Sequence, residues 1–304
     1  MGTPLLFQHK IATCINPPCV VVGSNEPARI EGLDVVTINS SAADLLSDGL
    51  EDLKKQLRAE AEDLCPDTSR TTLPPLRAVN HTIPPMDPKK VYRFRPSRSL
   101  EAFCKQQRIK KNPHLETGHW RTATGHNTIS LLMIPKISST NDDKPSLRTM
   151  FYKREQSANT YKLASPLPDV EEILREVSKH KFRSLIDGKD AYEQIQVILE
   201  HVGQTLFTTS DETMESLVMQ RRDCNAGATC QTLNHIFAPH IEVFMFVYSG
   251  DIIIFSDSVK EHVEHIRTIF DVLRREKLYL SPNKMQFFAE ELKILGHIID
   301  TGGI

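Results

Sequence analysis

Two apolar runs joined by a four-residue turn place the strongest constraint on how this chain folds. Residues 243–247 and 252–255 are dominated by β-branched, aromatic and other apolar side chains, which favour strands. The segment Tyr248-Ser249-Gly250-Asp251 between them is a tight turn, so the runs are expected to be neighbouring strands. A third run, at 182–186, ends at Asp187.

The periodicity of the remaining chain predicts alternating helices and strands. The expected helices cover residues 45–64, 170–177, 226–237 and 259–273, the last opening with a capping box at Ser258 and Glu261. The expected strands cover residues 35–38, 129–134, 147–151, 182–186, 207–209, 216–219, 243–247, 252–255, 278–280 and 292–299. No Gly-rich nucleotide fingerprint interrupts this order, which indicates an α+β fold with helices packed on one face of a sheet.

Charge is distributed unevenly along the 304 residues. The whole chain has 37 basic and 39 acidic side chains and a net charge of −2. Residues 71–160, however, hold 16 basic and six acidic side chains, a balance of +10, and aromatic residues are interleaved with the basic ones between 92 and 121. This asymmetry favours a nucleic-acid partner, although a solvated basic face would show the same composition.

Composition also suggests an organisation into three regions. Proline pairs near residues 74 and 84 predict an extended linker, with an acidic N-terminal segment at 1–70, a basic region at 71–160 and a second acidic region at 161–304. The six cysteines, without a secretion signal or an apolar run of 18 residues, predict a reduced intracellular protein, cytoplasmic or nuclear, that neither spans nor binds a membrane.

Asp187 and Asp251 are the strongest candidates for residues that take part in chemistry. Each lies at the end of an expected apolar strand, where a rigid, exposed carboxylate can hold a divalent metal. Two such strand ends side by side would suit two-metal phosphoryl transfer. Aspartate is also common in turns for conformational reasons alone. His262 and His265, on one turn of the last helix, are expected on a solvated face rather than at a metal site.

The segments around the two aspartates have specific sequences. Residues 184–195 read S-L-I-D-G-K-D-A-Y-E-Q-I, and residues 246–257 read F-V-Y-S-G-D-I-I-I-F-S-D. They resemble the first catalytic-aspartate motif and the Y-x-D-D hairpin of reverse transcriptases. Segments 258–288 and 295–297 are similar to the parts that follow this hairpin, and segments 73–77, 159–163, 165–168 and 225–229 resemble polymerases of gypsy-type LTR retrotransposons. The resemblance covers residues 73–304 and implies the fingers and palm of a right-handed polymerase without a complete thumb, with a fingers hairpin near 196–221.

The resemblance also implies specific roles. Asp187 and Asp251 would hold Mg²⁺ or Mn²⁺, and Lys284 would protonate the leaving pyrophosphate. The implied partners are an RNA or DNA template with its primer, and deoxynucleoside triphosphates. The residues implied for the nucleotide are Lys136, Arg154, Tyr192 and Gln231. The basic residues expected to contact nucleic acid are Arg93, Arg95, Arg98, Lys110, Lys111 and Arg121.

Several positions depart from the family pattern. Gly250 replaces the first aspartate of the hairpin and supplies no metal ligand. Tyr152 stands where the family usually has Asp, Ser157 where it has Asn, and Arg222 where it has Gly. We therefore expect a truncated polymerase domain with impaired chemistry. A non-catalytic nucleic-acid-binding remnant and an expressed product without a selected role are the alternatives.

Overall fold

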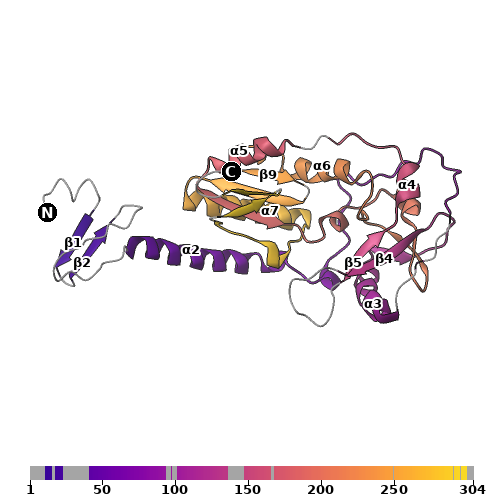
Figure 1. Ribbon diagram of the computed structural model, residues 1–304, viewed down its shortest axis with the longest axis horizontal. Coiled ribbons are helices and arrows are strands. Elements are labelled where there is room, and N and C mark those ends of the chain that lie inside the picture. Colours follow the sequence, from indigo (N-terminus) through magenta and orange to yellow (C-terminus); the bar gives the residue numbers. More distant parts are fainter. Residues whose placement is uncertain are drawn as a thin grey trace. The chain divides into compact units, whose positions relative to one another are not determined.

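The computed structural model describes the backbone of residues 11–15, 18–22, 41–93, 97, 101–135, 147–165, 168–248, 250–289, 291–294 and 296–299. The chain divides into two compact units, Met1–Glu60 and Ala61–Ile304. In the first unit, β1 (Ile11–Ile15) pairs antiparallel with β2 (Pro18–Val22), and helix α2 spans Ser41–Glu60 (Figure 1). Helix α2 accounts for most of the helix expected at 45–64, whereas the strand expected at 35–38 lies outside the described residues.

A three-stranded antiparallel sheet in the order β6-β10-β9, called the central sheet below, lies in one half of the second unit (Figure 1). Its strands are β6 (Phe182–Asp187), β10 (Asp251–Ser256) and β9 (Met245–Tyr248). Asp251 is the register partner of Tyr248 on one side and of Asp187 on the other. Residues 252–256 of the central strand are all buried, because both faces of the sheet are covered.

The two faces of the sheet are covered by different elements. Helices α6 (Ala226–Phe237) and α7 (Val259–Glu276) pack on one face. On the other face, Ile253 and Phe255 join a cluster formed with α5 (Val170–Ser178) and the hairpin of β11 (Leu292–Ile294) and β12 (His297–Ile299). This is the α+β polymerase palm that the sequence predicts, with the two longest covering helices together on one face.

Helix α7 begins at the expected capping box and is bonded to the sheet through His262. Ser258 Oγ accepts a hydrogen bond from Glu261 N and donates one to Glu261 Oε2. His262 is fully buried, with Nε2 2.7 Å from Ser184 Oγ and Nδ1 2.9 Å from Ser256 Oγ. The expectation that His262 lies on a solvated face is therefore wrong, since the imidazole joins β6, β10 and α7.

A second sheet of five strands, in the order β3-β8-β7-β4-β5, forms the fingers (Figure 1). The strands are β3 (Trp120–Thr122), β8 (Thr213–Ser216), β7 (Phe207–Thr208), β4 (Ile129–Pro135) and β5 (Leu147–Phe151). Trp120, Phe151 and Phe207 pack edge to face in its core. Helix α3 (Glu101–Glu116), which the sequence analysis did not predict, contributes Leu115 to this cluster. Helix α4 (Arg154–Ala158) follows β5 directly.

Two expected strands differ from the structure. The second strand of the expected hairpin lies at 213–216 instead of 216–219, because Met219 N bonds to Ile195 O outside the sheet. The segment 278–280 forms a single bridge between Leu280 and Gly188 and no strand. The short 3₁₀ helices are η1 (Glu62–Leu64), η2 (Thr68–Arg70), η3 (Ala191–Gln194), η4 (Leu199–Thr205) and η5 (Pro282–Lys284). Among the described residues, no helix is both long and apolar enough to cross a bilayer.

The proline-rich segment between 71 and 92 is extended, as expected, and is held against the rest of the second unit. His81 N donates to Gln196 O at 2.8 Å, and Ile83 is buried. Nearby, the buried carboxylate of Asp223 lies 2.7 Å from Lys153 Nζ and 3.3 Å from His81 Nε2. One buried aspartate thus connects the linker, the start of α4 and the segment before α6.

Candidate active site

The carboxylates of Asp187 and Asp251 meet where the neighbouring strands β6 and β10 of the central sheet end and begin. Asp187 is the last residue of β6 and Asp251 the first of β10, and the two are direct register partners. Partial burial and the adjacent Asp187 carboxyl, to which Asp251 is also hydrogen bonded, raise the pKa of Asp251 to about 6. Two acids this close repel each other when both are ionised, and a bound cation would remove that repulsion.

Lys284 lies beside this pair. Its Nζ is 3.0 Å from Asp187 Oδ2, and the lysine side chain is 65% exposed. The lysine is positioned by the segment after α7, which runs back along β6: Ser281 N donates to Asp187 O at 3.0 Å, and Leu185 and Gln286 exchange two backbone hydrogen bonds. The ammonium group is thus held at the carboxylates by the backbone that precedes and follows it.

Gly250 determines the shape of the turn that presents Asp251. Its φ is +106°, a backbone conformation that residues with a side chain rarely adopt. A Cβ atom at this position would lie 3.0 Å from the Cβ of Ala191. Gly250 O also accepts a hydrogen bond from Gly188 N at 3.2 Å. The glycine therefore fits a turn that leaves little space for a larger residue beside Ala191.

The donor set fits one divalent cation better than two. Mg²⁺ is commonly held by one or two carboxylates together with water and substrate phosphates, and Asp187 with Asp251 supplies such a pair. Within the described part of the chain, no three acidic, histidine or cysteine side chains gather into a metal-binding group. Gly250 contributes no side-chain oxygen, so the turn lacks the third carboxylate that would help to hold a second ion.

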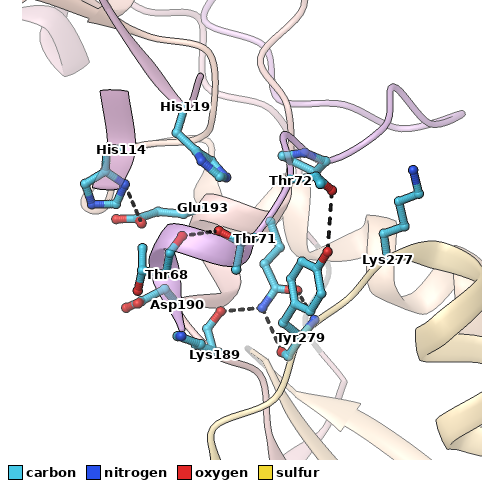
Figure 2. Close-up of a pocket in the computed structure, with 12 residues that line it drawn as sticks. Thr68, Thr71, Thr72, His114, His119, Lys189, Asp190, Glu193, Lys277 and Tyr279 are labelled. Atoms are coloured by element: carbon cyan, nitrogen blue, oxygen red, sulfur yellow. Dashed lines mark hydrogen bonds and ion pairs between the residues drawn. The ribbon is translucent and has the colours of Figure 1, made fainter. Parts of the chain in front are cut away.

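A polar cavity of about 380 Å³ opens beside η3, which begins four residues after Asp187. Figure 2 draws a neighbouring pocket that shares Glu193 and His114 with this cavity, and it shows the two side chains facing each other, with the Glu193 carboxylate 3.8 Å from His114 Nδ1. Burial and the nearby Asp190 raise the pKa of Glu193 to about 7, and burial lowers that of His114 to about 4. Asp190 forms an ion pair with Arg221 at the same cavity. Neither Glu193 nor His114 stood out in the sequence; the only signal is an acid directly after Tyr192.

A family profile described as "Reverse transcriptase (RNA-dependent DNA polymerase)" matches residues 64–299. The chain belongs to the reverse transcriptase family. It is 36% identical over 140 residues to the retrovirus-related Pol polyprotein from transposon 297 of Drosophila melanogaster, a match covering 46% of this chain and 13% of the polyprotein. The gypsy transposon polyprotein of the same organism is 29% identical over 160 residues, covering 52% of this chain and 16% of the polyprotein. The chain thus corresponds to a minor part of these polyproteins and carries the reverse transcriptase domain found in them.

Solved reverse transcriptases share the fold. The foamy viral protease–reverse transcriptase in complex with an RNA/DNA hybrid superposes with a TM-score of 0.66 at 17% identity, over 83% of this chain and 33% of that chain. A second structure of this viral protein, in complex with double-stranded DNA, gives a TM-score of 0.68 at 15% identity, over 94% and 52%. The expected fingers-and-palm architecture and the resemblance to retrotransposon reverse transcriptases are confirmed.

The structure places the remaining nucleotide-binding candidates on separate elements. Tyr192 is half-buried on η3, Gln231 is half-buried on α6, and Arg154 is exposed at the first position of α4. Lys136 lies outside the described residues. Their contact with a nucleotide stays a prediction.

The basic residues expected to contact nucleic acid divide into three groups. Arg93 is exposed, and Lys110 lines the polar cavity. Lys111 and Arg121 are engaged in ion pairs with Glu212 and Glu215. Arg95 and Arg98 lie outside the described residues. A role for these residues in nucleic-acid binding also stays a prediction.

Proposed function

We propose that this reverse transcriptase domain is the fingers and palm of an RNA-directed DNA polymerase whose nucleotidyl transfer is impaired in this copy. The pairing of Asp187 with Asp251 at one sheet edge, next to a glycine in the turn, carries the proposal. The substrates would be deoxynucleoside triphosphates and a primer annealed to an RNA or DNA template.

The residues at the sheet edge suit the handling of one divalent cation and its substrate. Asp187 and Asp251 would hold Mg²⁺ or Mn²⁺ between the two strand ends. Such an ion, when bound, lowers the pKa of a primer hydroxyl and offsets the charge of the phosphates. Lys284, 3.0 Å from Asp187, carries the proton that the leaving pyrophosphate would accept. Tyr192 would lie under the sugar and exclude a 2′-hydroxyl by its bulk.

The missing third carboxylate is the reason we propose impaired chemistry. Loss of one ligand from a site that must offset the charge of phosphoryl transfer raises the barrier, and about 2.7 kcal/mol corresponds to a hundredfold slower reaction.

Primer extension on poly(rA)–oligo(dT), with Mg²⁺ and with Mn²⁺, tests this function. The chain should extend the primer slowly, and Asp187→Ala should abolish extension. Gly250→Asp should restore activity best when it is combined with Ala191→Gly, because the glycine at 191 removes the methyl group that a new Cβ at 250 would meet at 3.0 Å. Fast extension by the unmodified chain, or equal extension by Asp187→Ala, would contradict the proposal.

The second candidate function is nucleic-acid binding without catalysis, and Gly250 is the observation that favours it. In that case an RNA–DNA hybrid would bind with a strong dependence on salt concentration. No primer would be extended by the chain or by the variant that carries both Gly250→Asp and Ala191→Gly. Primer extension by the double variant therefore distinguishes the two functions, because the two substitutions can restore activity only in a chain that is a polymerase.

A further inference from the structure

The hairpin formed by β7 and β8 brings acidic side chains against the basic residues of the fingers. The segment 207–216 holds three carboxylates and neither lysine nor arginine. Helix α3 and strand β3, against which it lies, carry five lysines and arginines between residues 105 and 121. Three of these five form ion pairs with the hairpin. The pairs are Arg108 with Asp211, Lys111 with Glu212, and Arg121 with Glu215.

The middle pair is the most firmly held. Lys111 Nζ lies 2.5 Å from Glu212 Oε1, and the lysine side chain is only 12% exposed. Glu212 also accepts a hydrogen bond from Thr122 Oγ1 at 3.1 Å, and its hydrogen bond to Lys111 is the main cause that lowers the pKa of this carboxyl. At the hairpin tip, Ser210 Oγ donates to Gln107 Oε1 of α3 at 3.3 Å.

The arginines of the outer pairs are more accessible. Arg108 and Asp211 are separated by 3.7 Å, and their side chains are 67% and 43% exposed. Arg121 is 58% exposed, whereas its partner Glu215 is 13% exposed. An exposed pair such as Arg108 with Asp211 contributes little to stability, so the arginine can exchange its partner at small cost. Arginine binds phosphate in the same two-pronged geometry that it uses for carboxylate.

We propose that this acidic hairpin occupies the phosphate-binding face of α3 and β3 and thereby weakens the binding of a nucleic-acid duplex. The hairpin carboxylates take the places that backbone phosphates would otherwise occupy. A duplex binds this face by exchanging carboxylate partners for phosphate, which costs affinity and reduces the number of counterions released. The inference rests on the nucleic-acid binding contained in the proposed function and does not require catalysis.

A triple variant tests the exchange: Asp211→Asn, Glu212→Gln and Glu215→Gln. Binding of a fluorescent 20-base-pair RNA–DNA hybrid is measured by anisotropy between 50 and 200 mM KCl. Each lysine or arginine side chain that becomes available for a phosphate should steepen the slope of log Kobs against log[salt] by about 0.9. The slope of the triple variant should therefore be steeper than that of the parent by up to about 2.7. The affinity of the triple variant at 100 mM KCl should rise at least tenfold.

The control variant carries the same change of net charge away from the fingers: Glu171→Gln, Glu172→Gln and Glu264→Gln. These three glutamates are exposed on α5 and α7. If the control steepens the slope as much as the hairpin variant does, a general charge effect explains the result and the inference is overturned. Glu215→Gln alone, which leaves the hairpin tip docked on α3, should give about a third of the effect.

Arg108→Gln provides an independent readout. In the parent, where Arg108 is paired with Asp211, the substitution should change the salt slope little, whereas in the triple variant it should reduce the slope by about 0.9. Equal reductions in both backgrounds would overturn the inference. The inference and the polymerase proposal can fail separately. If the triple variant binds the hybrid more tightly but extends no primer, the inference is supported and the polymerase proposal fails. If the parent extends primers and the salt slope of the triple variant equals that of the parent, only the inference is overturned.

Discussion

The buried imidazole of His262 makes the stability of the second unit depend on pH in a direction that the structure determines. Burial and the neighbouring His265 lower the pKa of His262 to about 3, against about 6.5 in an unfolded chain. The folded state therefore holds this histidine neutral, between Ser184 and Ser256. The contribution of His262 to the free energy of unfolding is fully present above pH 6.5 and is lost as the pH falls from 6.5 towards 3, because the unfolded state binds the proton and the folded state does not.

The magnitude follows from linkage between protonation and folding. Between pH 7 and pH 5, one histidine with these two pKa values lowers the free energy of unfolding by about 2 kcal/mol. Replacing it by a residue that does not titrate should remove that part of the pH dependence. His262→Gln is expected to be less stable than the parent at pH 7, since the two serine hydroxyls lose a well-placed partner, but its stability should fall by about 2 kcal/mol less on acidification.

Urea unfolding followed by tryptophan fluorescence measures this difference. The single tryptophan, Trp120, is buried in the second unit and reports on its unfolding. His297→Gln, at an exposed position on β12, is the matched control and should keep the pH dependence of the parent. Parallel stability–pH curves for the parent and His262→Gln would refute the reasoning, since the imidazole would then titrate alike in the folded and unfolded states.

Three further predictions concern stability and can be checked by thermal or urea unfolding. Gly250→Asp alone should lower the free energy of unfolding by about 1–3 kcal/mol, because φ at this position is +106°. Adding Ala191→Gly should recover the part of this loss that is due to the 3.0 Å contact between the two Cβ atoms, and an unchanged stability of Gly250→Asp would contradict the reasoning. Asp223→Asn should cost about 3–5 kcal/mol, since it leaves the ammonium of Lys153 buried without its counter-charge, and a cost below 1 kcal/mol would argue against the buried pair. Arg222→Gly should stabilise by about 0.5–1 kcal/mol by relieving a φ of +69°, whereas Arg222→Ala, which keeps the strain, should not.

Most of the central sheet could be predicted from the sequence because its strands are short apolar runs bounded by turns. The runs at 182–186 and 252–255 form β6 and β10 almost residue for residue, and Asp187 and Asp251 lie at their ends as expected. Strands that are covered on both faces leave this signal because most of their side chains are apolar, and the buried Ser184 and Ser256 are accommodated by hydrogen bonds with His262. Helix α3 was missed because its residues are mostly polar and a proline lies near its end, so it shows no apolar stripe.

The polar contacts of the site could not be predicted, because they join residues far apart in the chain. Glu193 meets His114 across 79 positions, and the hairpin acids meet their basic partners across about a hundred. Side-chain type alone does not indicate whether a lysine or arginine is available for phosphate. Of the six basic residues expected to bind nucleic acid, Lys111 and Arg121 are paired with carboxylates within the protein.

The sequence by itself determined the family, the order of the palm elements and the loss of a carboxylate at Gly250, since these depend on which residue follows which. Only the tertiary structure decided three other features. Asp251 shares its environment with Asp187, the turn at Gly250 closes against Ala191, and three hairpin carboxylates form ion pairs with basic residues of the fingers. The physical reason is that pKa, steric fit and ion pairing depend on distances of a few ångströms, and folding sets those distances between residues that the sequence separates.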